Sequence, residues 1–180
     1  YFLARPRRFG KSLFLSTAEA FFAGRRDLFA DLDADTPDRD WTPHEVIHID
    51  LSAKEYNSDD SLRCYLEELM LAYESREDSF APLMQLSVER RLANVIESLY
   101  RRSGRGVVIL IDEYDKPLLD AHRNPARLEA FRSLLKAFYA QLKSLDKYIR
   151  FVLMSGVTRF GKTSIFSDLN NLCDISDDPD

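Results

Sequence analysis

Residues 5–12 constrain the fold of this chain more than any other stretch. They read Arg-Pro-Arg-Arg-Phe-Gly-Lys-Ser, and they lie between a short apolar run at residues 1–4 and an amphipathic stretch at residues 13–22. A phosphate-binding loop needs this context, because a strand, a loop and a helix together aim backbone N–H groups and a helix N-terminus at an anion. Residues 10–12 supply the second half of the pattern G-x-x-x-x-G-K-[ST]. We therefore predict that residues 5–12 form a phosphate-binding loop.

The first half of this loop is not standard, because Arg5 stands at the position of the first glycine. Glycine is usual there since the turn favours backbone angles that a side chain resists, and Pro6 pushes Arg5 toward an extended conformation. Arg7 and Arg8 add positive charge. A cation about 4 Å from a phosphate oxygen gains roughly 4 kcal/mol of gross Coulomb energy at an effective dielectric of about 20. The alternative is that both arginines are ordinary solvated loop residues.

The second informative stretch is the apolar run at residues 107–111, which is followed by Asp112 and Glu113. Five consecutive branched residues predict a strand buried on both faces, as in a parallel sheet covered by helices. Its two carboxylates would lie at the carboxyl edge, where open α/β sheets bind ligands. We predict that Asp112 holds Mg²⁺ directly or through water, and that Glu113 orients or deprotonates an attacking water. The alternative is a strand that simply ends in a polar turn.

Four apolar runs predict strands and four amphipathic stretches predict helices. The strands are expected near residues 1–4, 46–51, 107–112 and 148–155. The helices are expected near residues 11–23, 60–75, 87–102 and 127–145. This order predicts an α/β fold, a parallel sheet with helices on both faces. The chain has 180 residues, 45% of them hydrophobic, which suits one domain with a sizeable core.

Two hydroxyl side chains, Ser155 and Thr158, stand at the end of the last predicted strand. Enzymes that hydrolyse nucleoside triphosphates often place a side chain there that senses the terminal phosphate. We therefore include both as candidate nucleotide contacts. The alternative, that they are ordinary polar residues at a strand end, has equal weight.

A second stretch, residues 156–163, matches the full pattern G-x-x-x-x-G-K-[ST] and precedes a predicted helix at residues 164–172. By motif matching alone it would be preferred over residues 5–12. Chain order favours the first loop, because a phosphate loop normally opens a nucleotide-binding fold and an acidic tail soon follows residue 163. Lys162 is either a coincidental match or a second basic group near the phosphates.

The charge and composition of the chain disfavour nucleic-acid-binding and membrane proteins. The formal net charge of −5 disfavours a global nucleic-acid-binding surface. No apolar run approaches the roughly 18 residues that span a bilayer, so no membrane association is expected. Cys64 and Cys173 are isolated and form no C-x-x-C pair, which predicts a reduced, cytoplasmic protein.

Three arginines stand around Gly104: Arg101, Arg102 and Arg105. They fit a helix end with cations at its negative pole. The alternative is that these three arginines contact nucleic acid.

Three stretches together resemble the AAA-ATPase-like domain of uncharacterised microbial proteins: residues 5–13, residues 112–117 (Asp-Glu-Tyr-Asp-Lys-Pro), and residues 156–160 with 164–172. In that family an Arg-Pro-Arg-Arg-Phe-Gly-Lys-Ser loop replaces the usual glycine-rich one, so Arg5 is an expected feature. The resemblance implies a P-loop NTPase fold of the AAA/ASCE type. Members commonly carry a further C-terminal, PD-(D/E)XK-like nuclease domain. We therefore expect residues 1–180 to be a P-loop core, a fragment without its N-terminal lead-in and its C-terminal domain. Gly161 and Lys162 depart from the family pattern.

The motifs and the resemblance lead to one hypothesis, that the chain is an enzyme that binds and hydrolyses ATP with Mg²⁺. Lys11 and Glu113 are the predicted catalytic residues, and Ser12 and Asp112 the predicted metal ligands. The predicted nucleotide contacts are Arg7, Arg8, Phe9, Gly10, Lys11, Ser12, Leu13, Ser155 and Thr158. ATP is preferred because the chain lacks the Asn/Thr-Lys-x-Asp signature of guanine recognition.

Two other functions stay open at this point. A nucleotide-gated switch or scaffold would bind ATP and hydrolyse it negligibly, which the non-standard loop makes a serious rival. A nucleic-acid-handling module would use five arginines, and its affinity would fall steeply with salt: Arg7, Arg8, Arg101, Arg102 and Arg105. A homo-oligomer is a further expectation, because an arginine finger could come from another subunit.

Overall fold

The computed structural model describes residues 1–75, 84–158 and 172–177. Its strands are β1 (Phe2–Ala4), β2 (Val46–Asp50), β3 (Val107–Asp112) and β4 (Ile149–Gly156). Its α-helices are α1 (Lys11–Phe22), α2 (Ser61–Glu74), α3 (Val88–Ser103), α4 (Lys116–Ala121) and α5 (Pro125–Ser144). The four predicted strands and four predicted helices are confirmed within one or two residues at each end. The sequence patterns did not predict α4, and the predicted helix at residues 164–172 lies almost wholly outside the described residues.

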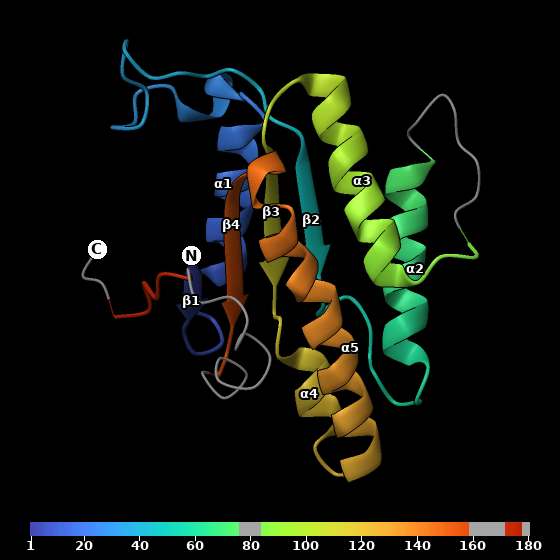
Figure 1. Cartoon of the computed structure of the whole chain (residues 1–180). Coiled ribbons are helices and arrows are strands. Elements are labelled where there is room, and N and C mark those ends of the chain that lie inside the picture. Colours follow the sequence, from blue (N-terminus) through green and yellow to red (C-terminus); the bar gives the residue numbers. More distant parts are fainter. Residues whose placement is uncertain (76–83, 159–171, 178–180) are drawn as a thin grey trace.

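All the described strands are parallel, and their order across the sheet is β1-β4-β3-β2. Strand β4, the last described strand, is therefore inserted between the strand that leads into the loop at residues 5–10 and the strand that ends in Asp112 (Figure 1). Because the strands are parallel, the residues that follow β1, β2 and β3 emerge at the same edge of the sheet. This edge is where ligands bind in open α/β sheets.

The chain returns to β1 after the last strand. The Phe2 N–H donates to the Cys173 carbonyl at 2.8 Å, and the Ile175 N–H donates to the Phe2 carbonyl at 2.9 Å. Strand β1 is thus flanked by β4 on one side and by residues 172–177 on the other. The backbone that leads into the predicted phosphate loop is held from both sides.

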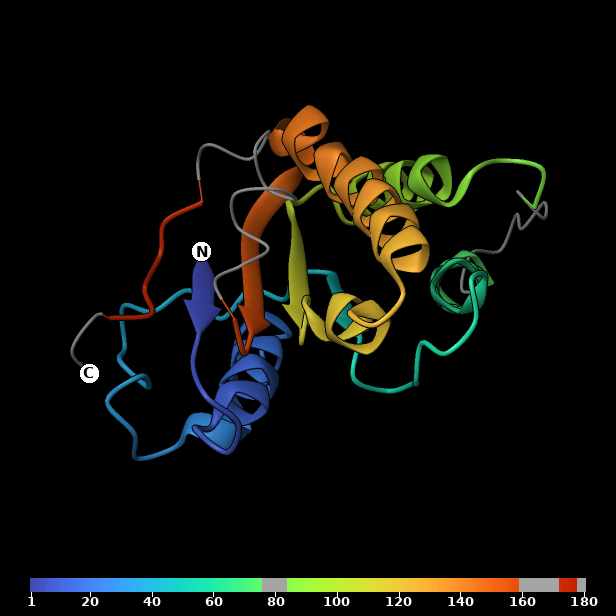
Figure 2. The same ribbon diagram turned by 90° about the horizontal axis from the view of Figure 1, so that it is seen from below.

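Helices cover both faces of the sheet (Figures 1 and 2). Helix α1 packs on one face, and α2, α3 and α5 form a layer on the other. Strand β3 lies between the two layers with residues 107–111 fully buried. Val107, Ile109 and Ile111 join the larger core, while Val108 and Leu110 join the smaller core under α1. The predicted α/β fold with a doubly buried central strand is confirmed, and it is compatible with a P-loop NTPase-like fold.

Three tyrosine hydroxyls bond to the backbone of β2 and of the residue after it, at one edge of the described sheet. Tyr73 accepts from the His48 N–H at 2.8 Å, and Tyr65 donates to the Asp50 carbonyl at 2.5 Å. Tyr56 donates to the Leu51 carbonyl at 2.9 Å. Burial, with the Asp50 carboxylate nearby, raises the pKa of Tyr65 to about 12. These bonds fix the end of β2, from which the chain runs into the candidate site.

A buried ion pair joins α2 to α3 and yields a test of the layer that they form. Arg91 donates to both carboxylate oxygens of Glu74, at 2.9 and 2.7 Å, and the two side chains are 4% and 5% exposed. Removing one partner leaves a buried charge, so we expect Arg91→Met to lower the free energy of unfolding by about 3 kcal/mol. Denaturant unfolding measures this loss.

The exposed pair between Arg101 and Glu97 is the matched control for the buried pair. Arg101→Met should cost less than about 0.5 kcal/mol, because a solvated i,i+4 pair contributes little. Replacing both Arg91 and Glu74 with Met should recover much of the loss. Equal losses for Arg91→Met and Arg101→Met would show that the buried pair does not hold the two helices together.

Candidate functional site

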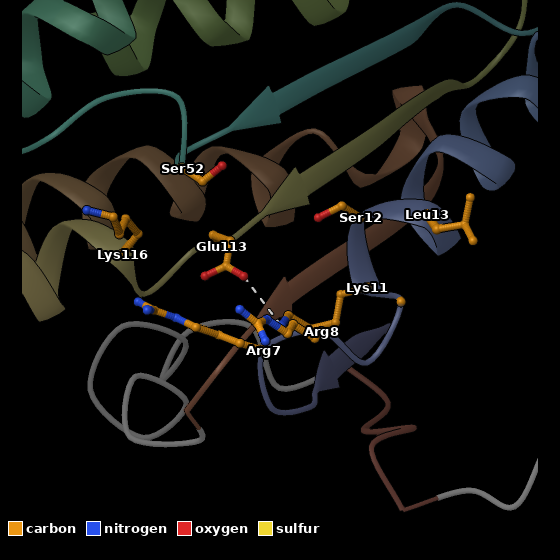
Figure 3. A pocket seen from close by; sticks show the side chains of 9 residues that line it. Arg7, Arg8, Lys11, Ser12, Leu13, Ser52, Glu113 and Lys116 are labelled. Atoms are coloured by element: carbon orange, nitrogen blue, oxygen red, sulfur yellow. Dashed lines mark ion pairs between the residues drawn. The ribbon is translucent and has the colours of Figure 1, made fainter.

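A cavity of about 460 Å³ opens at the carboxyl edge of the sheet. Its size lies in the range of small-molecule sites. Three segments contribute its described wall: the loop after β1 with the first turn of α1, a single residue shortly after β2, and the turn after β3 (Figure 3). The lining residues are Arg7, Arg8, Gly10, Lys11, Ser12, Leu13, Ser52, Glu113 and Lys116.

The loop after β1 enters the site differently from a glycine-rich loop. The Arg5 N–H donates to the Gly156 carbonyl at 3.2 Å, so Arg5 continues the pairing of β1 with β4, as expected for a residue before proline. The left-handed residues come later, at Arg8 (φ 69°) and Gly10 (φ 73°). Arg8 therefore carries the backbone strain that Arg5 avoids, at a cost of about 1–2 kcal/mol. Such strain concentrates at functional sites.

Helix α1 begins directly after this loop. Gly10 caps it with no side-chain hydrogen bond, and the first intrahelical bond runs from the Phe14 N–H to the Gly10 carbonyl at 2.8 Å. The N–H groups of the first turn have no intrahelical acceptor, and the helix dipole adds partial positive charge there. With cationic side chains lining the same cavity, this helix start favours an anion.

Lys11 and Glu113 meet inside the cavity. The Lys11 Nζ atom lies 3.4 Å from the Glu113 Oε1 atom (dashed line in Figure 3), and the two side chains are 4% and 16% exposed. The same ammonium donates to the Pro6 carbonyl at 3.3 Å. The structure thus brings together the two predicted catalytic residues, one from the loop after β1 and one from the end of β3. Their catalytic roles remain predictions.

Asp112, the last residue of β3, directly precedes Glu113 and is almost fully buried. Its Oδ1 atom accepts from the Glu113 N–H at 3.0 Å and from the Ser155 hydroxyl. Glu113 itself has a φ of 52°, which is rare for a residue other than glycine. This conformation turns the chain immediately after β3, so that Glu113 lines the cavity while Asp112 stays in the sheet.

Three of the predicted nucleotide contacts are absent from the described wall of the cavity: Phe9, Ser155 and Thr158. Ser155 is buried against Asp112, its neighbour across the β3–β4 pair. The Thr158 hydroxyl donates to Asp115 Oδ2 at 2.7 Å. Phe9 is 63% exposed on the loop. Their roles as nucleotide contacts remain predictions.

Two lining residues, Ser52 and Lys116, had no predicted role. Ser52 follows β2, and its hydroxyl donates to Asp50 Oδ1 at 2.7 Å. Lys116 is the first residue of α4 and pairs with Asp120. Their position in the sequence was the available signal, since each closely follows a strand that ends at the ligand-binding edge.

The second phosphate-loop pattern is only partly described. Gly161, Lys162 and Thr163 lie outside the described residues. Gly156 ends β4, where an added Cβ would come within 2.3 Å of Tyr114 Cε1 and 2.8 Å of Asp115 Oδ1. A packing reason therefore accounts for glycine at this position.

The arginines named for nucleic-acid contact fall into two separate groups. Arg101, Arg102 and Arg105 stand at the end of α3, just before β3 begins, while Arg7 and Arg8 follow the end of β1. Because the strands are parallel, the two groups lie at opposite edges of the sheet. Each residue of the first group has a partner within the chain. Arg101 pairs with Glu97, Arg102 pairs with Glu45, and Arg105 donates to the Pro43 carbonyl. Gly104 ends α3 with a φ of 67°, as predicted for a helix end.

Neither a bilayer-spanning helix nor a metal-binding cluster is found in the part of the chain that the structure describes. No described helix is long and apolar enough to cross a membrane. Within the same residues, no three His, Cys, Asp or Glu side chains are grouped to hold a metal ion. Both cysteines are exposed and free.

Comparison with known proteins identifies the family. A family model described as "Predicted AAA-ATPase" matches residues 1–166, and the chain belongs to this family. The resemblance inferred from the motifs is thereby confirmed, and the family description predicts an ATPase.

A curated relative is the "Uncharacterized protein in vnfD 5'region" of Azotobacter chroococcum mcd 1. It is 39% identical over 180 residues, which cover 99% of this chain and 34% of the relative. The chain thus spans about a third of that protein's length. No solved structure matches the chain.

Proposed function

We propose that residues 1–180 form a P-loop NTPase core that binds ATP with Mg²⁺ in the cavity described above and hydrolyses it. The observation that carries this proposal is the ion pair between Lys11 and Glu113, at 3.4 Å, inside a cavity at the carboxyl edge of a parallel sheet. A phosphate-binding cation and an acidic group for activating water are both needed for this reaction, and here they share one cavity. The family description supports the same proposal.

The charges of the cavity fit a polyphosphate. In the described wall, Glu113 supplies the one carboxylate, against four cationic side chains: Arg7, Arg8, Lys11 and Lys116. Cations and helix N–H groups bind phosphate oxygens through charge-assisted hydrogen bonds, which are stronger than neutral ones. Leu13 is the one apolar side chain of the described wall, so the wall recognises phosphates rather than a base. The preference for ATP over other triphosphates rests on the family description.

The oxygen groups of Ser12 and Asp112 fit Mg²⁺, which prefers hard oxygen ligands and keeps several waters. Ser12 lines the cavity, and Asp112 directly precedes Glu113, which also lines it. Both described bonds to the Asp112 carboxylate use Oδ1, which leaves Oδ2 for a metal-bound water. When bound, the ion neutralises charge on the phosphate oxygens.

Glu113 is the proposed base for hydrolysis. A water oxygen bonds to the terminal phosphorus, and the water proton passes to the Glu113 carboxylate. The bond between that phosphorus and its bridging oxygen breaks, and the electron pair leaves with ADP. Glu113 pairs with Lys11 in this structure, so bound phosphates would draw the Lys11 ammonium toward themselves and free the carboxylate.

Phosphate release by the wild-type chain tests this proposal. We expect release from ATP when Mg²⁺ is present and only background release when the metal is chelated, because the ion neutralises charge that develops on the phosphates. ATP binding is measured in the same samples by calorimetry. Binding without release above background would favour the nucleotide-gated switch, and absence of both would contradict the proposed function.

A further inference from the structure

The cavity continues past Glu113 to a residue with no assigned role. Figure 3 shows Lys116 on one side of Glu113 and the loop residues Lys11 and Arg8 on the other. All four line the same cavity. A phosphate chain bound to the loop would end near Glu113, next to Lys116, whose ammonium points away from Glu113 in Figure 3 and pairs with Asp120.

A tight turn fixes Lys116 relative to Glu113. The Lys116 N–H donates to the Glu113 carbonyl at 2.9 Å, and the left-handed conformation of Glu113 starts this turn. The Glu113 N–H in turn donates to Asp112 Oδ1 at 3.0 Å. The two side chains that line the cavity thus come from the first and last residues of one turn, whose start is tied to β3.

The middle of the turn is anchored to the end of β4. Asp115 is buried and accepts from the Val157 N–H at 3.1 Å and from the Thr158 N–H at 2.7 Å. The Tyr114 N–H donates to the Ser155 carbonyl at 2.9 Å. Lys116 therefore extends from a rigid base, which is the condition for placing a charge accurately in a site.

The Lys116 ammonium already has partners in this structure. It pairs with the Asp120 carboxylate, and it lies 6.0 Å from the centre of the Tyr56 ring. Asp120 Oδ2 also accepts from the Tyr56 N–H at 3.1 Å, which fixes the carboxylate. A lysine ammonium has three donors, and its flexible four-carbon side chain can rotate from Asp120 toward a ligand in the cavity.

We propose that Lys116 is a catalytic residue that contacts the terminal phosphoryl group from the side opposite Lys11. This inference rests on the proposed ATPase function. While water bonds to phosphorus and the bond to ADP breaks, negative charge lies on the oxygens of the phosphoryl group being transferred, and the water proton goes to Glu113. Lys116 stabilises that charge and transfers no proton. The chain thereby supplies in cis the cation that many NTPases receive from a partner.

Phosphate release and ATP affinity of Lys116→Ala and Lys116→Arg test this role. We expect Lys116→Ala to lower the maximal rate by about 10³-fold, the lower end of the effect of a finger residue. Its Kd for a nonhydrolysable ATP analogue should change by less than about tenfold, because the contact acts mainly on charge in the transition state. Lys116→Arg should retain most of the rate since it keeps the charge, although its geometry differs.

Lys54→Ala is the matched control. Lys54 likewise pairs with a carboxylate, that of Glu68, and lies 5.3 Å from the centre of the Tyr65 ring, but it is not part of the described cavity wall. This variant should keep the wild-type rate. Melting curves of all variants separate a loss of folding from a loss of rate. The rate per chain should also be independent of protein concentration, because the cation comes from the same chain.

Two results would overturn the inference alone. One is wild-type hydrolysis that Lys116→Ala leaves unchanged. The other is activity regained when Lys116→Ala is mixed with a Glu113→Gln chain, which would show that Lys116 acts between subunits. A wild-type chain that binds ATP and releases no phosphate above background would instead overturn the proposed function, and this inference with it.

Discussion

Lys11→Ala is expected to weaken ATP binding by roughly 10–100-fold, since a hydrogen bond to a charged group contributes about 1.5–3 kcal/mol. Hydrolysis should fall further, by about 10³-fold, because the same ammonium faces charge that builds up on the phosphates. Lys11 is nearly buried at the start of α1, and its Nζ atom lies 3.4 Å from Glu113. A side chain from the protein surface could therefore not take over its contact with the phosphates. Calorimetry and phosphate release measure the two effects.

Lys162→Ala is the natural comparison for Lys11→Ala, because Lys162 belongs to the second phosphate-loop pattern. If residues 5–12 form the real loop, Lys162→Ala should bind ATP within about threefold of wild type, as expected for a residue that makes no direct phosphate contact. Melting curves check that Lys11→Ala folds despite leaving Glu113 without its partner. Loss of binding in Lys162→Ala, with wild-type binding in Lys11→Ala, would move the site to the second pattern.

Glu113→Gln should separate chemistry from binding. Removing a general base typically costs about 10²–10⁴-fold in rate, so phosphate release should fall by that amount. ATP binding should be kept or strengthened, because the change removes the one carboxylate of the described cavity wall, where it lies among cations. The rate should therefore fall without any loss of ATP binding, a combination that a general loss of structure cannot produce.

Glu68→Gln is a suitable control for this experiment, because Glu68 is exposed and pairs with Lys54 outside the described cavity wall. It should leave both rate and binding unchanged. Equal, background-level release by wild type and Glu113→Gln, with binding intact in both, would identify a nucleotide-gated switch instead of an ATPase.

The sequence predicts the layers of this fold well, because the patterns that mark them are local. The five branched residues before Asp112 predict a doubly buried strand, and the structure buries all of them. The amphipathic stretches predict four helices with accurate ends. Helix α4 is missed because six residues are too few to show a helical period. Strand order also depends on contacts far apart in the sequence, which periodicity does not report.

The candidate site is predicted less completely, for two physical reasons. Ser155 looks available at the end of a strand, but the pairing of β4 with β3 places it beside Asp112, which takes its hydrogen bond. Lys116 looks like an ordinary helix residue. It reaches the cavity because Glu113 adopts a φ of 52°, a conformation that nothing in the sequence indicates for a glutamate.

The position of the backbone strain in the loop also differs from the one that the sequence motif predicts. The motif predicts strain at Arg5, where a glycine is usual. Arg5 instead extends β1, and Arg8 adopts the left-handed conformation with its side chain lining the cavity. The non-standard residues thus add charge to the site at a modest cost in backbone energy.

The most direct test of the central claim is a crystal structure of the chain with Mg²⁺ and a nonhydrolysable ATP analogue. The proposed function predicts the phosphates in the cavity between residues 5–12 and Glu113, with Lys11 moved from Glu113 onto them. Phosphates bound at residues 156–163, or anywhere away from Lys11 and Glu113, would contradict it.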